Sequence, residues 1–379
     1  MAGPLHTAVH ALAFVAGVAV VLLTFLSAVR TVILPRAVPT RLGRMTATVT
    51  RGAFRVLSGR TPSYERRDSV FALYGPVGLL NLQASWLLVV YLGSAAIFWA
   101  LDAGGIRHCL TLSGSSLLTL GFAIPHSGPQ TAVTFLEAVI GLLLLALLIT
   151  YLPSVYTAFS RREQAVSKLE VRAGTPPTGT EMIWRAYSLQ REDVLLATFA
   201  EWESWFVDIE ETHTSFPMLA YFRSPQPDHS WVTAAGAVLD AAALYASSVE
   251  RERSADPQLC IRAGRIALTR IAVYYGLTVP ASISYGDPVT VSRSEYDDAL
   301  ERMAAGGAPI VADRDRAYAD FAGWRVNYDV PLVALAALTY APYAPWSSDR
   351  SLARQRSGRL RRRRDSRPPP PPEVRLPGG

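Results

Sequence analysis

The chain has 379 residues, of which half are hydrophobic and only 18% are charged, and its mean hydropathy is +0.19. Soluble proteins carry about a quarter charged residues, so the apolar excess must be concentrated in particular segments. It lies in the first 160 residues, in uncharged runs long enough to cross a bilayer. Two cysteines, Cys109 and Cys260, exclude a disulfide framework and a cysteine-rich zinc site. Lys168 is the single lysine, and the glycine fingerprints for phosphate loops and dinucleotides are absent.

Positive and negative charges are unevenly distributed along the chain. Residues 1–152 carry a net charge of +6, residues 153–346 carry −7, and residues 347–379 carry +7. A basic excess that flanks apolar runs favours contact with an anionic membrane surface over a nucleic-acid groove. We therefore expect membrane lipid as a partner and no nucleic acid.

The first apolar run begins near the N-terminus. No charged residue precedes Arg30, and residues 9–29 are long enough to span the hydrocarbon layer. A cleaved signal peptide would need a basic stretch before a shorter apolar region. The sequence therefore predicts a retained transmembrane helix over residues 1–30.

A basic segment follows this helix. Nine arginines and only two acidic residues occur between positions 30 and 68. Such a bias in a short connection fixes it on the cytoplasmic side. We therefore predict a basic cytoplasmic loop over residues 31–68 and an N-terminus outside the cell membrane.

The next apolar run is too long for one straight crossing. Residues 69–101 contain no charged residue and would make a helix of about 50 Å, against about 30 Å of hydrocarbon. Gly75-Pro76 offers a break. We expect an interfacial helix over residues 69–82 and an outer transmembrane helix over residues 84–101.

Two further apolar segments complete the membrane part. Residues 108–124 are too short to cross, which predicts a re-entrant segment, and residues 131–152 cross back and end at Pro153. Together with the preceding helices they form a pore-type module over residues 69–158. The predicted fold is thus an all-α, multi-pass membrane protein with three transmembrane helices and a cytoplasmic C-terminus.

Residues 159–346 are predicted to form a helical cytoplasmic domain. The clearest helix covers residues 192–209, where apolar residues recur at helical spacing. A Pro/Gly/Thr linker covers residues 172–180, and residues 347–379 are predicted to be a disordered Arg/Pro-rich tail. Other helices are expected over residues 230–250, 258–275, 294–304, 313–325 and, as a buried core helix, 330–341.

The most informative motif lies at the end of the re-entrant segment. Its residues are Thr119-Leu120-Gly121-Phe122-Ala123, and an inner-helix pattern, Glu137-x-x-x-Gly141, follows. Here residues 84–160 resemble the pore module of bacterial potassium channels, whose filter reads Thr-Val-Gly-Tyr-Gly-Asp. The structural alternative is an extracellular hairpin with a glycine turn.

The resemblance implies a homotetramer, because a filter needs backbone carbonyls from four copies of the loop. It implies that K⁺ or another monovalent cation binds at Thr119, Leu120 and Gly121, with no other cofactor or metal. Carbonyl groups that face one axis require some residues at positive φ, which Gly121 can supply. Where the family has glycine and then aspartate, this chain has Ala123 and Ile124. We therefore expect a relaxed outer filter and weak potassium selectivity.

Glu137 and Gly141 are candidates for pore or hinge residues of the inner helix. An intramembrane carboxylate is a functional candidate by default, and the alternative is a carboxylate that reaches interfacial water. Gly141 is either the bend of the helix or a close-packing point.

Two short motifs outside the membrane part resemble functional sites by their letters alone. Tyr285-Gly286-Asp287 matches half of a potassium filter but has no flanking span, so we interpret it as a loop turn. Glu210-x-x-His213 has the spacing of a di-iron ligand pair but lacks the second pair that such a site needs. We interpret it as a solvated helix end.

The leading functional hypothesis is a tetrameric cation channel. The second is a non-conducting membrane anchor or sensor that keeps the pore fold and signals through its cytoplasmic domain. An enzyme is not expected, because no nucleophile–base pair, metal cluster or phosphate loop stands out. The sequence does not identify a ligand of the cytoplasmic domain.

Overall fold

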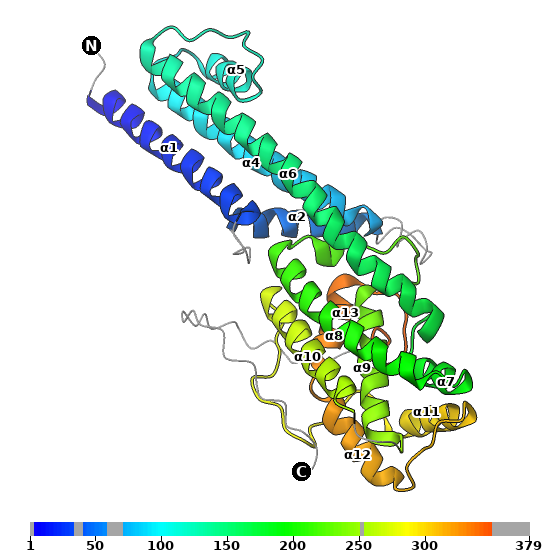
Figure 1. Ribbon diagram of the computed structural model, residues 1–379. Coiled ribbons are helices and arrows are strands. Elements are labelled where there is room, and N and C mark those ends of the chain that lie inside the picture. The colour runs from blue at the N-terminus through cyan, green and yellow to red at the C-terminus, as the bar shows by residue number, and fades with distance from the viewer. Residues whose placement is uncertain (1–3, 34–40, 59–70, 251–253, 351–379) are drawn as a thin grey trace. The chain divides into compact units, whose positions relative to one another are not determined.

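The computed structural model describes four stretches of the chain, residues 4–33, 41–58, 71–250 and 254–350 (Figure 1). Their regular structure is helical, with one isolated bridge between Val249 and Ile310 and no strand. The predicted all-α class is therefore confirmed. The chain divides into two compact units, the first with residues 1–158 and 215–222 and the second with residues 159–214 and 223–379.

Three of the described helices are long and apolar enough to cross a membrane. They are α1 (Pro4–Val32), α4 (Tyr74–Ala100) and α6 (Gly128–Ala173). The predicted number of candidate spans is thus confirmed.

In the first unit, α1 and α4 pack antiparallel and approach closely at two glycines. A Cβ atom on Gly17 would lie 2.7 Å from the Gly93 carbonyl oxygen, and one on Gly93 would lie 3.0 Å from Val21. Small residues at such crossings let two helices approach in an apolar surrounding. Trp86 and Val90 of α4 are buried in the resulting core.

The break in the second apolar run lies earlier than predicted. Residues 74–100 form the single helix α4, instead of an interfacial helix over 69–82 and a separate span over 84–101. Pro76 lies in the first turn of this helix, where its missing N–H group would have had no intrahelical partner. Residues 69 and 70 lie outside the described residues.

A helix, α2 (Arg41–Ser58), replaces part of the predicted basic loop. It packs on α4, where the Thr46 hydroxyl lies 3.1 Å from that of Ser85 and the Phe54 and Tyr74 rings meet edge to face at 5.3 Å. Figure 1 shows α2 running across one end of the α1–α4 pair. The loop prediction is therefore wrong for residues 41–58, while residues 34–40 and 59–70 lie outside the described residues.

The last candidate span is also longer than predicted. α6 does not end at Pro153 but continues to Ala173. The proline removes one backbone hydrogen bond, whereas the hydroxyls of Thr150, Ser154 and Thr157 each bond a carbonyl oxygen of the preceding turn.

A segment between α8 and α9 belongs to the first unit. Residues 215–222 include a short 3-10 helix, Leu219–Tyr221. The Tyr221 hydroxyl accepts a 2.5 Å hydrogen bond from Arg51 of α2. A Cβ atom on Gly75 would lie 2.4 Å from the Phe222 ring, so glycine is required for this contact with α4.

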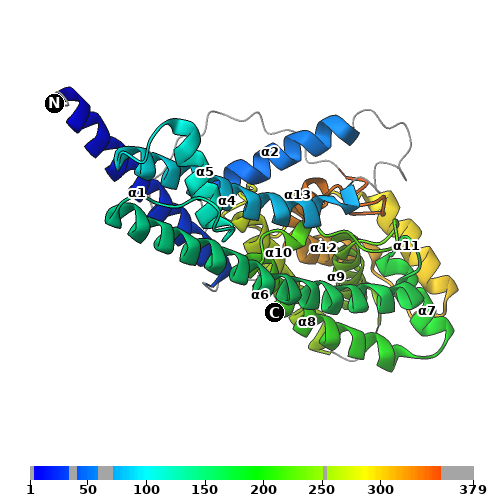
Figure 2. The same ribbon diagram turned by 90° about the horizontal axis from the view of Figure 1, so that it is seen from above.

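The second unit is a helical domain around α9 (Trp231–Ser248), which is buried along most of its length (Figures 1 and 2). The predicted helices are all present, with small shifts at their ends. α7 (Gly179–Ser188) was not predicted, although Thr178 and Glu181 have capping-box spacing. The remaining helices are α8 (Glu192–Ser215), α10 (Asp256–Tyr274), α11 (Arg293–Ala305), α12 (Arg314–Arg325) and the buried α13 (Asp329–Thr339).

The predicted tail begins later than residue 347. Ser347 is buried, and Arg350 forms an ion pair with Glu295 of α11. Burial alone would raise the pKa of Glu295, but its hydrogen bonds with Arg350 and Ser292 outweigh burial and lower that pKa to about 2. The first residues of the predicted tail are therefore part of the second unit, and residues 351–379 lie outside the described residues.

A buried arginine joins three elements of the second unit. Arg325 is fully buried and bonds Asp240 of α9, Asp329 of α13 (2.9 Å) and the Trp346 carbonyl oxygen. Asp240 also accepts a 2.8 Å bond from the Tyr328 hydroxyl. Burial raises the pKa of Asp240 to about 6, against the opposing effect of Arg325.

We expect Arg325→Met to lower the free energy of unfolding by about 3–5 kcal/mol, because it leaves two buried carboxylates without their cation. Arg314→Met, at the exposed start of the same helix, is the matched control and should change stability by less than about 0.5 kcal/mol. Thermal or denaturant unfolding of the full chain in detergent measures both. Equal stability of the two variants would contradict this account of the network.

Candidate functional site

The candidate site is built around the short helix α5 (Ile106–Leu117). After its last turn the Leu120 amide donates to the Ser115 carbonyl oxygen at 2.9 Å, and the Thr119 amide donates to the Ser116 carbonyl oxygen at 3.0 Å. This pair of bonds is a Schellman cap, whose turn residue adopts a left-handed conformation. That residue is Thr119, at φ +55°.

Gly121 and Ala123, which follow this cap, differ in the sign of their backbone φ angles. Gly121 lies at φ +72°, and no atom outside its chain neighbours would meet a Cβ placed on it. Ala123 does not adopt positive φ, and its amide donates to the Ser115 hydroxyl at 3.1 Å. The outer part of the segment therefore lacks the left-handed residue that a glycine would provide at position 123.

Side chains of the same segment divide by exposure. Ala123 packs against a small core that includes Phe98 and Cys109. Leu120, Phe122 and Ile124 are 61%, 65% and 71% exposed in the single chain. The segment thus anchors one small side chain and leaves three large apolar side chains uncovered.

Glu137 lies in the interior of the first unit, against α5. Its carboxyl group is buried, and Oε1 lies 2.5 Å from the hydroxyl of Ser113. That hydroxyl also lies 2.9 Å from the carbonyl oxygen of Tyr91 in α4.

The Ser113 hydroxyl is shared between α4 and α6. A hydroxyl carries one proton and can donate fully to one acceptor only. The Ser113 hydroxyl lies within donating distance of both the Glu137 carboxyl group and the Tyr91 carbonyl oxygen. Glu137 is therefore a tie between three helices, rather than a carboxylate exposed at a surface.

Gly141 lies one turn beyond Glu137 on the same face of α6. A Cβ atom at this position would lie 2.2 Å from the Leu117 carbonyl oxygen at the end of α5. Such a separation is shorter than any real contact of a Cβ atom. Of the two roles predicted for Gly141, the structure therefore supports the close-packing point.

A polar side chain also ties the start of α6 to its surroundings. Gln130 donates to the Leu101 carbonyl oxygen at 3.0 Å and accepts from the His126 amide at 2.9 Å. The His126 and His108 rings are stacked with centroids 5.8 Å apart. Gln130 at the start of α6 is thus joined both to the turn after α4 and to the backbone that follows the exposed residues.

Comparison with known proteins adds no assignment: no family model matches the chain, and no curated protein or solved structure is significantly similar to it.

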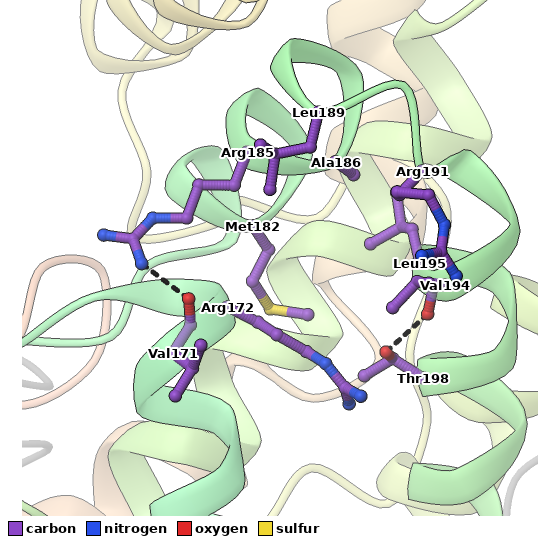
Figure 3. Close-up of a pocket in the computed structure, with 10 residues that line it drawn as sticks. All are labelled: Val171, Arg172, Met182, Arg185, Ala186, Leu189, Arg191, Val194, Leu195 and Thr198. Carbon is purple, nitrogen blue, oxygen red and sulfur yellow. Dashed lines mark hydrogen bonds between the residues drawn. The ribbon is translucent and has the colours of Figure 1, made fainter.

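The second unit contains an apolar cavity of about 130 Å³ between the end of α6, α7 and the start of α8 (Figure 3). The Met182 side chain reaches from α7 toward Arg172 of α6. Three arginines line the cavity, and each has a partner: Arg172 pairs with Glu201, Arg185 with Glu181 and Arg191 with Asp193. The cavity is therefore lined mainly by apolar surface, and an acidic side chain neutralises the charge of each lining arginine.

The interpretation of Glu210-x-x-His213 as a solvated helix end is wrong for its histidine. His213 is fully buried and not part of a solvated helix end. Its Nδ1 donates to the Ile209 carbonyl oxygen at 2.8 Å, and its Nε2 accepts from Arg162 at 3.3 Å. Burial lowers the pKa of His213 well below its usual value, and the positive charge of Arg162 lowers it further. Phe206, Ile209 and His213 continue the apolar stripe of α8, so the spacing could have indicated this burial.

The Tyr285-Gly286-Asp287 motif forms a turn, as predicted. Gly286 lies at φ +95°, and the Ser284 amide donates to the Asp287 carboxylate at 2.8 Å. Neither residue belongs to the first unit, which holds Thr119 and Gly121.

We expect Gly141→Ala to lower the free energy of unfolding by about 1–3 kcal/mol or more, because the added methyl overlaps a backbone oxygen that cannot move without shifting α5. Gly128→Ala in the same helix is the matched control, since no atom lies within 4 Å of a Cβ there. Thermal unfolding in detergent compares the two. An alanine at position 141 that is as well tolerated as one at position 128 would show that α6 does not pack on the end of α5.

Proposed function

We propose that the protein is a homotetrameric pore-loop cation channel of the potassium-channel type, located in the cell membrane, with a filter that is altered at its outer end. In this proposal α4 is the outer helix, α5 the pore helix, residues 119–123 the filter and α6 the inner helix. The N-terminus lies outside, and the second unit is cytoplasmic, as the arginine bias before residue 68 favours.

The observation that carries the proposal is the depth at which α5 ends. Its last carbonyl group contacts α6 at Gly141, thirteen residues after α6 begins at Gly128, which corresponds to about 20 Å along the helix axis. If α4 and α6 cross a bilayer, α5 therefore enters it and stops well inside. A helix of this length cannot leave on the far side, so the chain must return through residues 118–127.

Irregular backbone at this depth restricts what can surround it. Non-helical segments inside a bilayer are tolerated only where protein covers them or where they line a water-filled cavity. Residues 118–122 are exposed in the single chain. Further copies of the same loop around a central pore would satisfy this requirement, because a cyclic assembly brings equivalent surfaces to one axis.

The proposed ion sites are the backbone carbonyl groups of Thr119, Leu120 and Gly121. Four copies of this stretch would replace part of the hydration shell of K⁺ or another monovalent cation. Ala123 at negative φ, and Ile124 in place of an acid, argue for fewer or distorted outer sites. Weak selectivity for potassium over sodium follows from that loss.

We expect purified protein in planar bilayers to conduct with weak potassium selectivity, and Ala123→Gly combined with Ile124→Asp to sharpen it. Gly121→Ala should abolish the current, because alanine at φ +72° costs about 1–2 kcal/mol in each subunit. Gly105→Ala is the matched control: this residue precedes α5 at φ −67°, with open space around it, and its substitution should leave the current unchanged.

Sharply potassium-selective wild-type currents would contradict the altered filter. Currents unaffected by Gly121→Ala would contradict the placement of the ion sites. Current from the double variant, but none from wild type, would favour a second function, a non-conducting anchor or sensor that keeps the pore fold. The bond from the Ala123 amide to Ser115 favours that alternative, because it holds the outer segment against α5.

A further inference from the structure

Two histidines of α1 and an aspartate after α4 form a compact group. His6 and His10 lie one helical turn apart, with ring centroids 4.0 Å from each other. Asp102 follows the end of α4, and its Oδ1 lies 3.3 Å from Nδ1 of His10. One ligand atom from each residue can be chosen so that all three lie within 4.8 Å of one another.

The donor set and spacing fit a transition metal ion. Two imidazole nitrogens and one carboxylate oxygen suit zinc and its neighbours in the first transition row, whereas calcium and magnesium prefer oxygen alone. Bonds of about 2.0–2.1 Å in a tetrahedron place neighbouring ligand atoms about 3.3–3.4 Å apart. The pair His10–Asp102 already has this separation, and His6 is an exposed side chain that can close the remaining gap.

The surroundings hold two of the three ligands in position. The His10 ring packs on Trp99 with centroids 4.5 Å apart. Asp102 adopts φ +54°, and its amide bonds the Trp99 carbonyl oxygen at 3.1 Å. Contacts of this kind orient metal ligands and restrict their rotamers before an ion arrives.

Among the residues that the structure describes, no other group of three or more histidine, cysteine or acidic side chains meets the same spacing. We infer that His6, His10 and Asp102 bind a divalent transition metal ion of the zinc class, with at least one coordination position left for water. The ion bridges Nδ1 of His10 and Oδ1 of Asp102. It thereby links the start of α1 to the turn that leads into α5.

The link has a structural consequence within the first unit. The turn that carries Asp102 also contains Leu101, whose carbonyl oxygen accepts the bond from Gln130 of α6. A bound ion therefore ties α1 to the same turn that α6 holds. Its effect is a stabilisation of the first unit, independent of whether the protein conducts ions.

The test is zinc titration of the full chain in nanodiscs by isothermal calorimetry, with a C-terminal tag that contains no histidine. We expect one Zn²⁺ per chain, and a loss in affinity of at least about tenfold for His6→Ala, His10→Ala and Asp102→Asn separately. Cobalt binding should give the visible absorption of a four-coordinate site, which these variants lose. His6 and Asp102 are exposed, so their substitution leaves the fold intact.

The control is the double variant His108→Ala with His126→Ala. It removes a second close pair of histidines in the same unit, which forms no such group with a carboxylate among the described residues. Its zinc affinity should equal that of wild type. Absence of saturable binding to wild type, or an equal loss of affinity in this control, would overturn the assignment.

Discussion

The hydrogen bond between Ser113 and Glu137 is the contact on which the arrangement of the first unit depends. α5 is a twelve-residue helix with several serines among its buried residues, and it lies between two long apolar helices, so its buried hydroxyl groups need partners inside the protein. Ser113 finds two, the Glu137 carboxyl group on α6 and the Tyr91 carbonyl oxygen on α4. One turn further on, Gly141 lets α6 approach the end of α5 to backbone contact. The hydrogen bonds of Ser113 and the close approach at Gly141 together fix the position of α5 against α4 and α6.

The two units meet the requirement for satisfied buried polar groups in different ways. The first uses hydroxyl, amide and carboxyl groups that can be neutral, as in Ser113, Glu137 and Gln130. The second buries a formal charge, Arg325, and surrounds it with two carboxylates. An uncompensated charge is costly wherever it is buried, so the second unit pairs its buried arginine with two carboxylates.

Periodicity and length in the sequence predict most of the helices. The apolar runs predict α1, α4 and α6, and the stripe of α8 predicts its burial, because both patterns depend on local spacing alone. The predicted helix boundaries are wrong where a charge bias or a proline was given more weight than the helical spacing of apolar residues. The arginine bias predicts a loop, although α2 combines its arginines with recurring apolar positions. Pro76 and Pro153 predict breaks, but both residues lie within helices.

The geometry of the candidate site can be predicted only in part from the sequence. The positive φ of Gly121 follows from the residue type, whereas Thr119 adopts positive φ because it caps α5, which no propensity indicates. The contact of Gly141 with Leu117 joins residues far apart in the chain, and single-sequence spacing cannot reveal such a pair. His6, His10 and Asp102 were missed for the same reason, because the third ligand comes from another helix end.

We propose that one chain supplies one quarter of a pore, because residues 119–121 are a single copy of the filter stretch. Native mass spectrometry of the protein released from lipid nanodiscs tests this claim most directly. The account predicts a dominant species at four times the chain mass of 41.2 kDa. A stable monomer or dimer as the dominant species would contradict it.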